Sequence, residues 1–198
     1  METFILSTHD PKALEVALET LAHGELVAFP TDTVYGLGAL VSDAQAIDKL
    51  FMVKGRDTAK AIAVLLGSTE ALPQIAREMS PAAQRLAQRF WPGPLTLVVA
   101  RHPALPENLS PLPTVGVRMP DHPDALALLN LAGPLAVTSA NLSGAPDTRT
   151  AQEVFDQLGG LIPLILDGGL TPGGAPSTVV DCTNPEFPIL RAGPITQE

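Results

Sequence analysis

Hydrophobic positions along the chain form two kinds of pattern, one with a helical period and one of unbroken apolar runs. The helical period predicts amphipathic helices, as in 43–53, where Ala46, Ile47, Leu50 and Phe51 fall on one face. The apolar runs predict buried strands, as in 61–66. We expect helices over 12–23, 43–53, 81–90, 121–132 and 150–158.

Turn-forming residues separate these segments. Ser80 and Pro81 are typical of a helix start, and Gly24 suits the left-handed position at a helix end. We expect strands over 3–6, 25–29, 61–66, 94–100, 114–117, 135–138, 162–166, 178–181 and 188–191. Strands that alternate with helices, without a linker or an internal repeat, predict one α/β domain over 1–198 with a largely covered sheet.

Composition and charge narrow the function classes. The 198 residues are 45% hydrophobic and 17% charged, which excludes a disordered chain. A formal net charge of −9 argues against a broadly basic nucleic-acid surface, but it permits a local basic pocket. Cys182 is the one cysteine, so no internal disulfide can form. Because the N-terminus also lacks a signal-peptide pattern, we expect a cytoplasmic protein.

One uncharged stretch, 125–146, is long enough to raise the question of a membrane span. It is broken by Gly133 and Pro134 and carries several polar side chains. We therefore interpret it as a buried helix, a turn and a buried strand, and expect no membrane association.

Three common kinds of site are not supported. The glycine-rich stretch 168–178 lacks the lysine of a phosphate-binding P-loop. Gly36 and Gly38 lack the third glycine of a dinucleotide fingerprint. The four histidines are scattered, and none has metal-ligand spacing, so we expect no resident metal.

Polar clusters at the ends of predicted elements remain as candidates. They are 29–38, 54–56, 115–120, 138–144, and the glycine-rich stretch 168–178 together with 190–194. Each has a plain structural alternative: hydrogen-bonded turns, a cation that caps a helix end, a salt bridge or a flexible connection. The sequence alone leaves these alternatives open.

Taken together, the clusters supply Lys54, Arg56, Arg118 and Arg191, which are four of only twelve cations, and surround them with serine, threonine and asparagine. Such a set predicts a pocket that holds anions by charge and orientation. No Ser-His-Asp set or evident nucleophile accompanies it. Phosphoryl-type chemistry fits best, because it depends mainly on positioning and charge neutralisation.

Several motifs in this order resemble the YrdC/TsaC family of L-threonylcarbamoyladenylate synthases, over about 20–194. The motifs are Pro30–Gly38, Lys54–Arg56, Trp91–Thr96, Val117–Pro120, Thr138–Gly144, and Ser177–Asp181 with Leu190–Arg191. The resemblance implies a YrdC-like fold, a twisted, open, mixed α/β sheet with helices on its faces, around a positively charged cavity. It also implies that L-threonine, bicarbonate or CO₂, and ATP give threonylcarbamoyl-AMP and pyrophosphate, for the threonylcarbamoyladenosine modification of tRNA.

The resemblance also implies residue roles. Thr31, Arg118 and Ser177 would bind threonine. Those expected to bind ATP are Lys54, Arg56, Ser139, Asn141 and Arg191, and the first four would be the catalytic set. Mg²⁺ would arrive with ATP, because the sequence offers no carboxylate cage. Proteins of the TsaD, TsaB and TsaE type would be functional partners, and a weak tRNA contact is part of the expectation.

This chain departs from the family pattern at several places. Asp57 stands where many relatives have proline, and Pro176 where relatives often have glutamate. The region 63–66 is wholly apolar where some relatives have a histidine, and the chain ends soon after Pro194, which favours the short, single-domain type. Two alternatives stay open: an RNA-binding module without synthase activity, and a carbamoyl-transfer domain of the hydrogenase-maturation kind.

Overall fold

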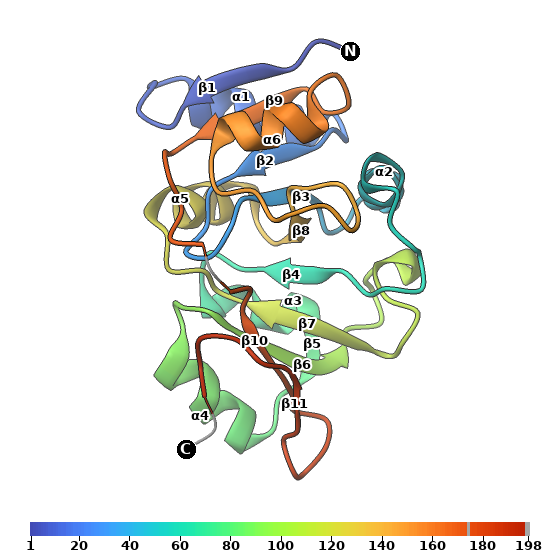
Figure 1. The fold of residues 1–198 in the computed structure, drawn as a ribbon. Helices are drawn as coiled ribbons and strands as arrows, with labels where there is room; N and C mark the ends of the chain where they lie inside the picture. Colours follow the sequence, from blue (N-terminus) through green and yellow to red (C-terminus); the bar gives the residue numbers. More distant parts are fainter. Residues whose placement is uncertain (174, 197–198) are drawn as a thin grey trace.

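A single mixed sheet organises the molecule (Figure 1). The computed structural model describes residues 1–173 and 175–196. Within these residues, eleven strands belong to the sheet. They are β1 (Phe4–Ser7), β2 (Val27–Phe29), β3 (Gly36–Leu40), β4 (Ala63–Leu65), β5 (Ala76–Glu78), β6 (Leu95–Arg101), β7 (Thr114–Arg118), β8 (Leu135–Ser139), β9 (Leu164–Asp167), β10 (Thr178–Asp181) and β11 (Ile189–Arg191).

The strand order mixes segments that are far apart in the sequence. It runs β1-β9-β2-β3-β8-β4-β7-β6-β10-β11, and β5 pairs with β6 outside this path. The pairs β1/β9, β2/β9, β4/β7 and β6/β10 are parallel. The pairs β2/β3, β3/β8, β4/β8, β6/β7, β5/β6 and β10/β11 are antiparallel. The sheet is therefore mixed, as the family resemblance implies.

Helix ends follow the local sequence signals. The helices are α1 (Ala13–Ala22), α2 (Ala44–Lys54), α3 (Leu72–Ile75), α4 (Pro81–Phe90), α5 (Pro123–Ala132) and α6 (Ala151–Leu158), with short 3-10 turns at Thr69–Ala71 and Glu107–Leu109. The Asp43 carboxylate caps α2, and the Ser80 hydroxyl caps α4. Thr150 and Glu153 form a capping box at the start of α6. No helix in the described residues has the length and hydropathy that a membrane crossing needs.

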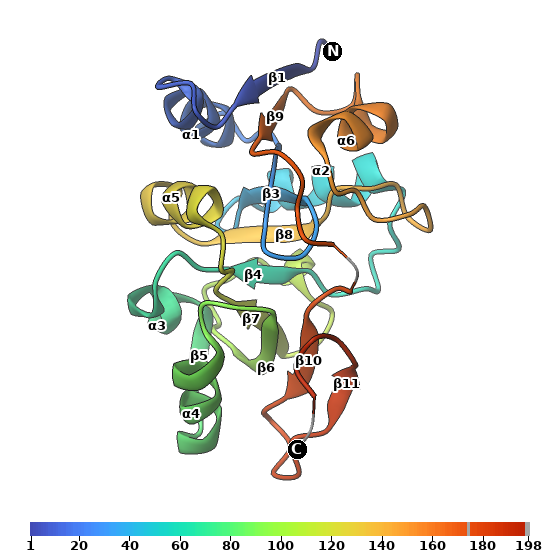
Figure 2. The ribbon, with the colours of Figure 1, turned by 60° about the vertical axis from the view of Figure 1, so that its left-hand side comes forward.

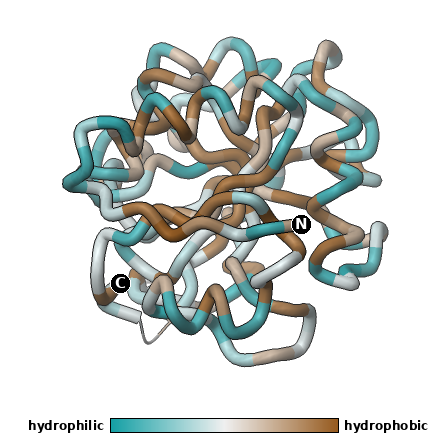
Figure 3. Tube along the Cα trace, turned by 90° about the horizontal axis from the view of Figure 1, so that it is seen from above, coloured by the Kyte–Doolittle hydropathy of each residue, from teal (hydrophilic) through white to brown (hydrophobic). Residues whose placement is uncertain are grey.

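Helices cover both faces of the first half of the sheet. Figure 2 shows α1 and α5 on one side and α2 and α6 on the other. The α1/α5 side buries Leu21, Phe29 and Leu128 in one apolar cluster, whereas α2 and α6 contribute to a second, larger cluster. Seen from above, hydrophobic segments gather in the middle and hydrophilic ones lie outside (Figure 3). Burial of both faces explains the unbroken apolar runs.

The structure corrects two parts of the sequence interpretation. Gly36–Leu40 forms the buried strand β3, whereas the sequence placed Gly36 and Gly38 in a polar turn cluster. α1 begins at Ala13, one residue later than expected, and the Asp10 carboxylate accepts a hydrogen bond from the Lys12 backbone N–H in the preceding turn, at 2.8 Å. α3 and β5 were not predicted. The remaining helices and strands lie where the patterns indicate, within one or two residues at most ends.

Candidate active site

One face of the central strands forms the floor of a pocket of about 360 Å³. Side chains two residues apart on a strand point to the same face, and the floor follows this rule. It takes Ala63 and Leu65 from β4, Thr96 and Val98 from β6, Gly116 and Arg118 from β7, and Val137 and Ser139 from β8. The register places Leu65 beside Arg118 and Val98 beside Gly116. Residues distant in the sequence therefore meet on one surface.

Two glycines keep this floor open. A Cβ at Gly36 would lie 2.9 Å from Val137 Cγ1, and one at Gly116 would lie 3.0 Å from Thr96 Cγ2. The first contact is closer than packed side chains allow, and the second is tight. Gly36 therefore lets two strands pair where their side chains would collide, which explains a glycine inside a strand.

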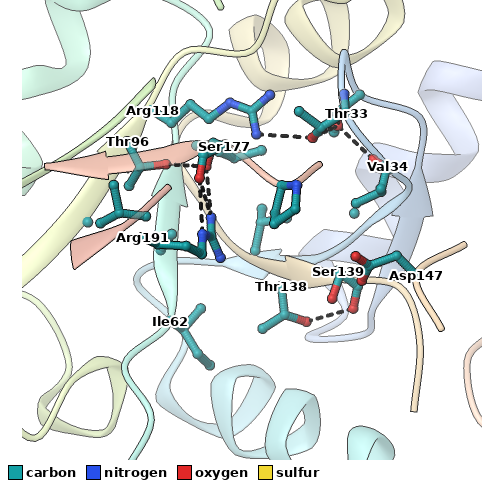
Figure 4. A pocket seen from close by; sticks show the side chains of 18 of the residues that line it. Thr33, Val34, Ile62, Thr96, Arg118, Thr138, Ser139, Asp147, Ser177 and Arg191 are labelled. Carbon is teal, nitrogen blue, oxygen red and sulfur yellow. Dashed lines mark hydrogen bonds between the residues drawn. The ribbon is translucent and has the colours of Figure 1, made fainter. Parts of the chain in front are cut away.

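Arg118 forms the most deeply buried charged part of the pocket, with 6% of the residue exposed. Its Nε donates to Gly93 O at 3.1 Å, Nη1 donates to Thr33 Oγ1 at 3.2 Å, and Nη2 is ion-paired with Asp32. A guanidinium has five N–H groups, and two of them have no partner among the described residues. Burial lowers the pKa of Arg118, and the Asp32 carboxylate opposes that shift. The salt bridge that the sequence left open as an alternative is therefore present, and Arg118 also faces the pocket (Figure 4).

The loop that carries Thr33 is held by its own hydroxyls. Thr31 Oγ1 donates to Val34 O at 2.6 Å and accepts from the Thr33 backbone N–H at 3.2 Å. These are the turn bonds that serine and threonine commonly make. The hydrogen-bonded turn that the sequence left open as an alternative is therefore present, and Thr31 and Thr33 also line the pocket.

Lys54 supports the pocket wall from behind. It is 3% exposed, and its Nζ donates to the backbone oxygens of Ser139 and Asn141 and, at 3.2 Å, to Asn141 Oδ1. Ser139 Oγ in turn donates to Asn141 Oδ1 at 2.5 Å. Burial, followed by the charge of Arg56, lowers the pKa of Lys54 from 10.5 to about 8. Lys54 thus fixes the shape of the strand end that presents Ser139.

Arg56 reaches the pocket just beyond the end of α2. Gly55 takes the left-handed conformation there, with φ of 57°, and turns the chain out of the helix. Arg56 Nη2 donates to Ala61 O at 3.0 Å, whereas its buried Nε has no partner among the described residues. Arg56 is half-buried, so it is held far more loosely than Arg118.

A third wall comes from the C-terminal strands. Arg191 donates through Nε and Nη2 to Ser177 O at 3.0 and 2.8 Å, and Nη2 also donates to Ser177 Oγ at 3.0 Å. Ser177 Oγ lies 2.7 Å from Thr96 Oγ1 (Figure 4). A Cβ at Gly193 would lie 2.4 Å from Thr178 N, so glycine permits this close approach. Gly174, in the predicted glycine-rich cluster, lies outside the described residues.

The pocket gathers most of the residues that the sequence singled out. Those that line it are Thr31, Arg56, Arg118, Ser139, Ser177 and Arg191. Lys54 and Asn141 lie behind the wall and contact Ser139. The proposed contacts of all eight with substrates stay predictions.

Other residues of the site were not singled out. Asp32 and Thr33 lie inside the motif Pro30–Gly38, so the sequence could indicate that they lie near the site. That they bind Arg118 could not be predicted from the motif. Asp147, an exposed side chain on the pocket wall, has no sequence signal, because it is a single aspartate in a loop. No group of three or more histidine, cysteine or acidic side chains that could hold a metal occurs in the described part of the chain.

Known proteins share both the sequence pattern and the fold. The sequence model of the Sua5/YciO/YrdC family, described as "Telomere recombination", matches residues 19–193. The threonylcarbamoyl-AMP synthase of Bacillus subtilis is 43% identical over 98% of this chain, and that of Pyrococcus abyssi is 42% identical over 93%. The crystal structure of Pyrococcus abyssi Sua5 complexed with L-threonine is 43% identical and superposes with a TM-score of 0.89 over 91% of this chain.

The alignments do not cover these relatives completely. This chain spans 56% of the Bacillus protein, 55% of the Pyrococcus protein and 54% of the chain in the threonine complex. Within that span, the match includes every motif on the pocket wall described above. Because the family's sequence pattern and its fold both extend through nearly the whole molecule, the chain belongs to the Sua5/YciO/YrdC family.

Proposed function

We propose that this chain forms threonylcarbamoyl-AMP and pyrophosphate from L-threonine, bicarbonate or CO₂, and ATP, as a nucleotidyltransferase. The observation that carries the proposal is the convergence of Arg56, Arg118 and Arg191 with Ser139 and Ser177 on one pocket. Relatives named threonylcarbamoyl-AMP synthase, and a relative's complex with L-threonine, support the same assignment. They do not favour an RNA-binding module without synthase activity.

The inner end of the pocket suits the amino acid. Two N–H groups of Arg118 have no partner among the described residues, and the planar donor groups of a guanidinium match a carboxylate. Thr31, Thr33 and Ser177 place hydroxyl groups around the same space. In the proposed reaction, the neutral threonine amine attacks CO₂. The new N–C bond gives a carbamate, and the amine loses a proton.

The outer end suits the nucleotide. Arg56 and Arg191 would contact the phosphates, and the wall that Lys54 and Asn141 support would present Ser139 to the same ligand. A carbamate oxygen then attacks the α-phosphorus, a P–O bond forms, and pyrophosphate leaves with the electron pair of the broken P–O bond. The positive charges of Arg56 and Arg191 would stabilise the negative charge that develops on the pyrophosphate.

Mg²⁺ fits this pocket as a companion of the triphosphate. In the described part of the chain, the wall offers the carboxylate of Asp147 together with hydroxyl oxygens such as that of Ser139. Mg²⁺ is usually held by one or two carboxylates plus substrate phosphates and water. When bound, the ion would offset negative charge on the departing pyrophosphate.

The proposal is tested by pyrophosphate release. We expect release only when ATP, L-threonine and bicarbonate are present together, with threonylcarbamoyl-AMP detected by mass spectrometry. Release that continues without threonine would contradict the proposal. Addition of TsaD-, TsaB- and TsaE-type proteins and tRNA tests whether the product supports threonylcarbamoyladenosine formation, the wider role that we propose with a cytoplasmic location.

A further inference from the structure

The charged side chains on the described pocket wall include a negative one among positive ones. Arg56, Arg118 and Arg191 are cationic, and among the described residues that line the pocket Asp147 is the one carboxylate. Figure 4 shows Asp147 next to Ser139, with its side chain directed toward the pocket. A pocket for a triphosphate gains nothing from a bare negative charge, because like charges repel. The position of Asp147 therefore requires its own explanation.

The backbone around Asp147 is held firmly in place. Pro146 O accepts from Gln157 Nε2 at 3.1 Å, and Thr148 O accepts from the Tyr35 backbone N–H at 2.9 Å. The Thr148 hydroxyl donates to Ala140 O at 3.0 Å. Anchors on both sides fix Asp147 at the pocket mouth, on the loop that follows the Ser139 strand end.

No fold contact accounts for the Asp147 carboxylate. Within the described residues, it forms no hydrogen bond and no ion pair. Its negative charge nevertheless affects the nearby cations. Burial lowers the pKa values of Lys54 and Arg191, and the charge of Asp147 partly opposes that shift. The carboxylate is thus exposed to a ligand, close to the cations, and free of a structural task.

We propose that Asp147 makes this pocket select the metal-complexed triphosphate over the metal-free one. This inference rests on the proposed function. A free triphosphate would bring its negative charge against the carboxylate. A divalent cation between the phosphates and Asp147 turns that repulsion into attraction, and Mg²⁺ favours oxygen ligands of this kind. In this proposal the charge of Asp147 affects which form of the triphosphate binds, and Asp147 takes no part in the chemical step.

The test measures binding, so it does not depend on turnover. Inorganic tripolyphosphate is titrated calorimetrically into the protein with and without Mg²⁺, and the ratio of the two affinities is compared between variants. We expect Asp147→Asn to lower the ratio roughly five- to tenfold, mainly because metal-free tripolyphosphate binds more tightly. Asp147→Glu keeps the charge and is expected to retain most of the preference.

Asp156→Asn is the matched control. Asp156 is an exposed carboxylate on α6 that does not line the pocket, so its replacement removes the same formal charge and is expected to leave the ratio unchanged. Thermal unfolding of each variant confirms that the fold is intact.

Three results would overturn the inference. An unchanged ratio in Asp147→Asn would do so. So would a loss of metal-free AMP binding, which would assign Asp147 to the ribose hydroxyls, or a loss of L-threonine binding, which would assign it to the ammonium group. If the parent protein binds neither tripolyphosphate nor ATP with or without Mg²⁺, the proposed function fails as well. Normal binding with an unchanged ratio removes only the role of Asp147.

Discussion

The two ends of the pocket are built in different ways. The inner wall (Asp32, Thr33 and Arg118) is buried. The guanidinium of Arg118 contacts the Gly93 backbone oxygen and the side chains of Asp32 and Thr33. At the mouth, Arg56 is half-buried and makes one hydrogen bond, and Asp147 makes none within the described residues. The inner wall is preorganised, so binding there needs little ordering, whereas side chains at the mouth lose freedom when a ligand arrives. One pocket can therefore hold a small rigid ligand firmly and still adapt to a flexible one.

The largest expected effect concerns the inner wall. Arg118→Met leaves the Asp32 carboxylate buried without its cation, so we expect unfolding to become easier by about 3–5 kcal/mol. Chemical denaturation measures this change. The double variant Asp32→Asn with Arg118→Met removes both charges and is expected to recover a large part of the loss. If the double variant is no more stable than the single one, the two residues are not coupled.

The second largest expected effect concerns Lys54, which supports the pocket wall from behind. Lys54→Met keeps the length of the side chain but leaves three acceptor oxygens around Ser139 and Asn141 without their donor. We expect about 2–3 kcal/mol less transition-state stabilisation, measured as kcat/KM for threonylcarbamoyl-AMP formation. The control is Lys49→Met on the same helix, which removes the partly exposed ion pair to Glu25 and one hydrogen bond to Gly24 O, neither of which involves a residue that lines the pocket. Equal losses in both variants would show that Lys54 has no special role.

A smaller effect is expected for the mouth itself. Arg56→Ala removes one hydrogen bond and a half-buried charge, so the free energy of unfolding is expected to stay within about 0.5 kcal/mol of the parent value. We expect nucleotide binding to weaken by about 1–2 kcal/mol, with threonine binding nearly unchanged. Calorimetric titration of each ligand separates the two. A larger loss for threonine would reverse the assignment of the two pocket ends.

The smallest effect is a pH dependence from Lys54. Its pKa in the folded protein is about 8, below the 10.5 of an exposed lysine. Between these pH values the unfolded chain binds the proton more tightly, so the contribution of Lys54 to stability rises as pH rises. We expect the unfolding free energy of the parent protein, relative to Lys54→Met, to increase by about 1 kcal/mol between about pH 7 and pH 9. If the difference in unfolding free energy decreases with pH instead, the hydrogen bonds to the three acceptor oxygens raise the pKa of Lys54 more than burial lowers it.

The sequence was most informative where a local rule decides the structure. Ser80 and Thr150 start helices because their hydroxyls bind free backbone N–H groups, and Gly55 ends one in the left-handed conformation. The motifs around Arg118, Ser139 and Arg191 were predicted to meet, and they line one pocket. Their meeting follows from strand ends and family motifs, both of which can be found in the order of residues.

Other features depend on contacts that no local pattern contains. Gly36 and Gly38 look like turn residues, yet they lie in the strand β3. Glycine is needed there because Val137 and Phe29 fill the space that larger side chains would occupy. The predicted ligand contact of Lys54 stays a prediction, whereas its hydrogen bonds to oxygens 85 and 87 residues away in the chain were not predicted. The ion pair between Asp32 and Arg118 is equally distant. Tertiary packing decides such cases, and propensity does not.

The strand order of the sheet also determines when a binding pocket can exist during synthesis. β1 pairs with β9, and the pocket wall draws on segments from Thr31 to Arg191. A nascent chain that has released only its first half from the ribosome therefore lacks the C-terminal wall and cannot form the pocket. High contact order of this kind slows folding. Binding of any ligand in this pocket would consequently report that the chain has been translated and folded at least as far as Arg191.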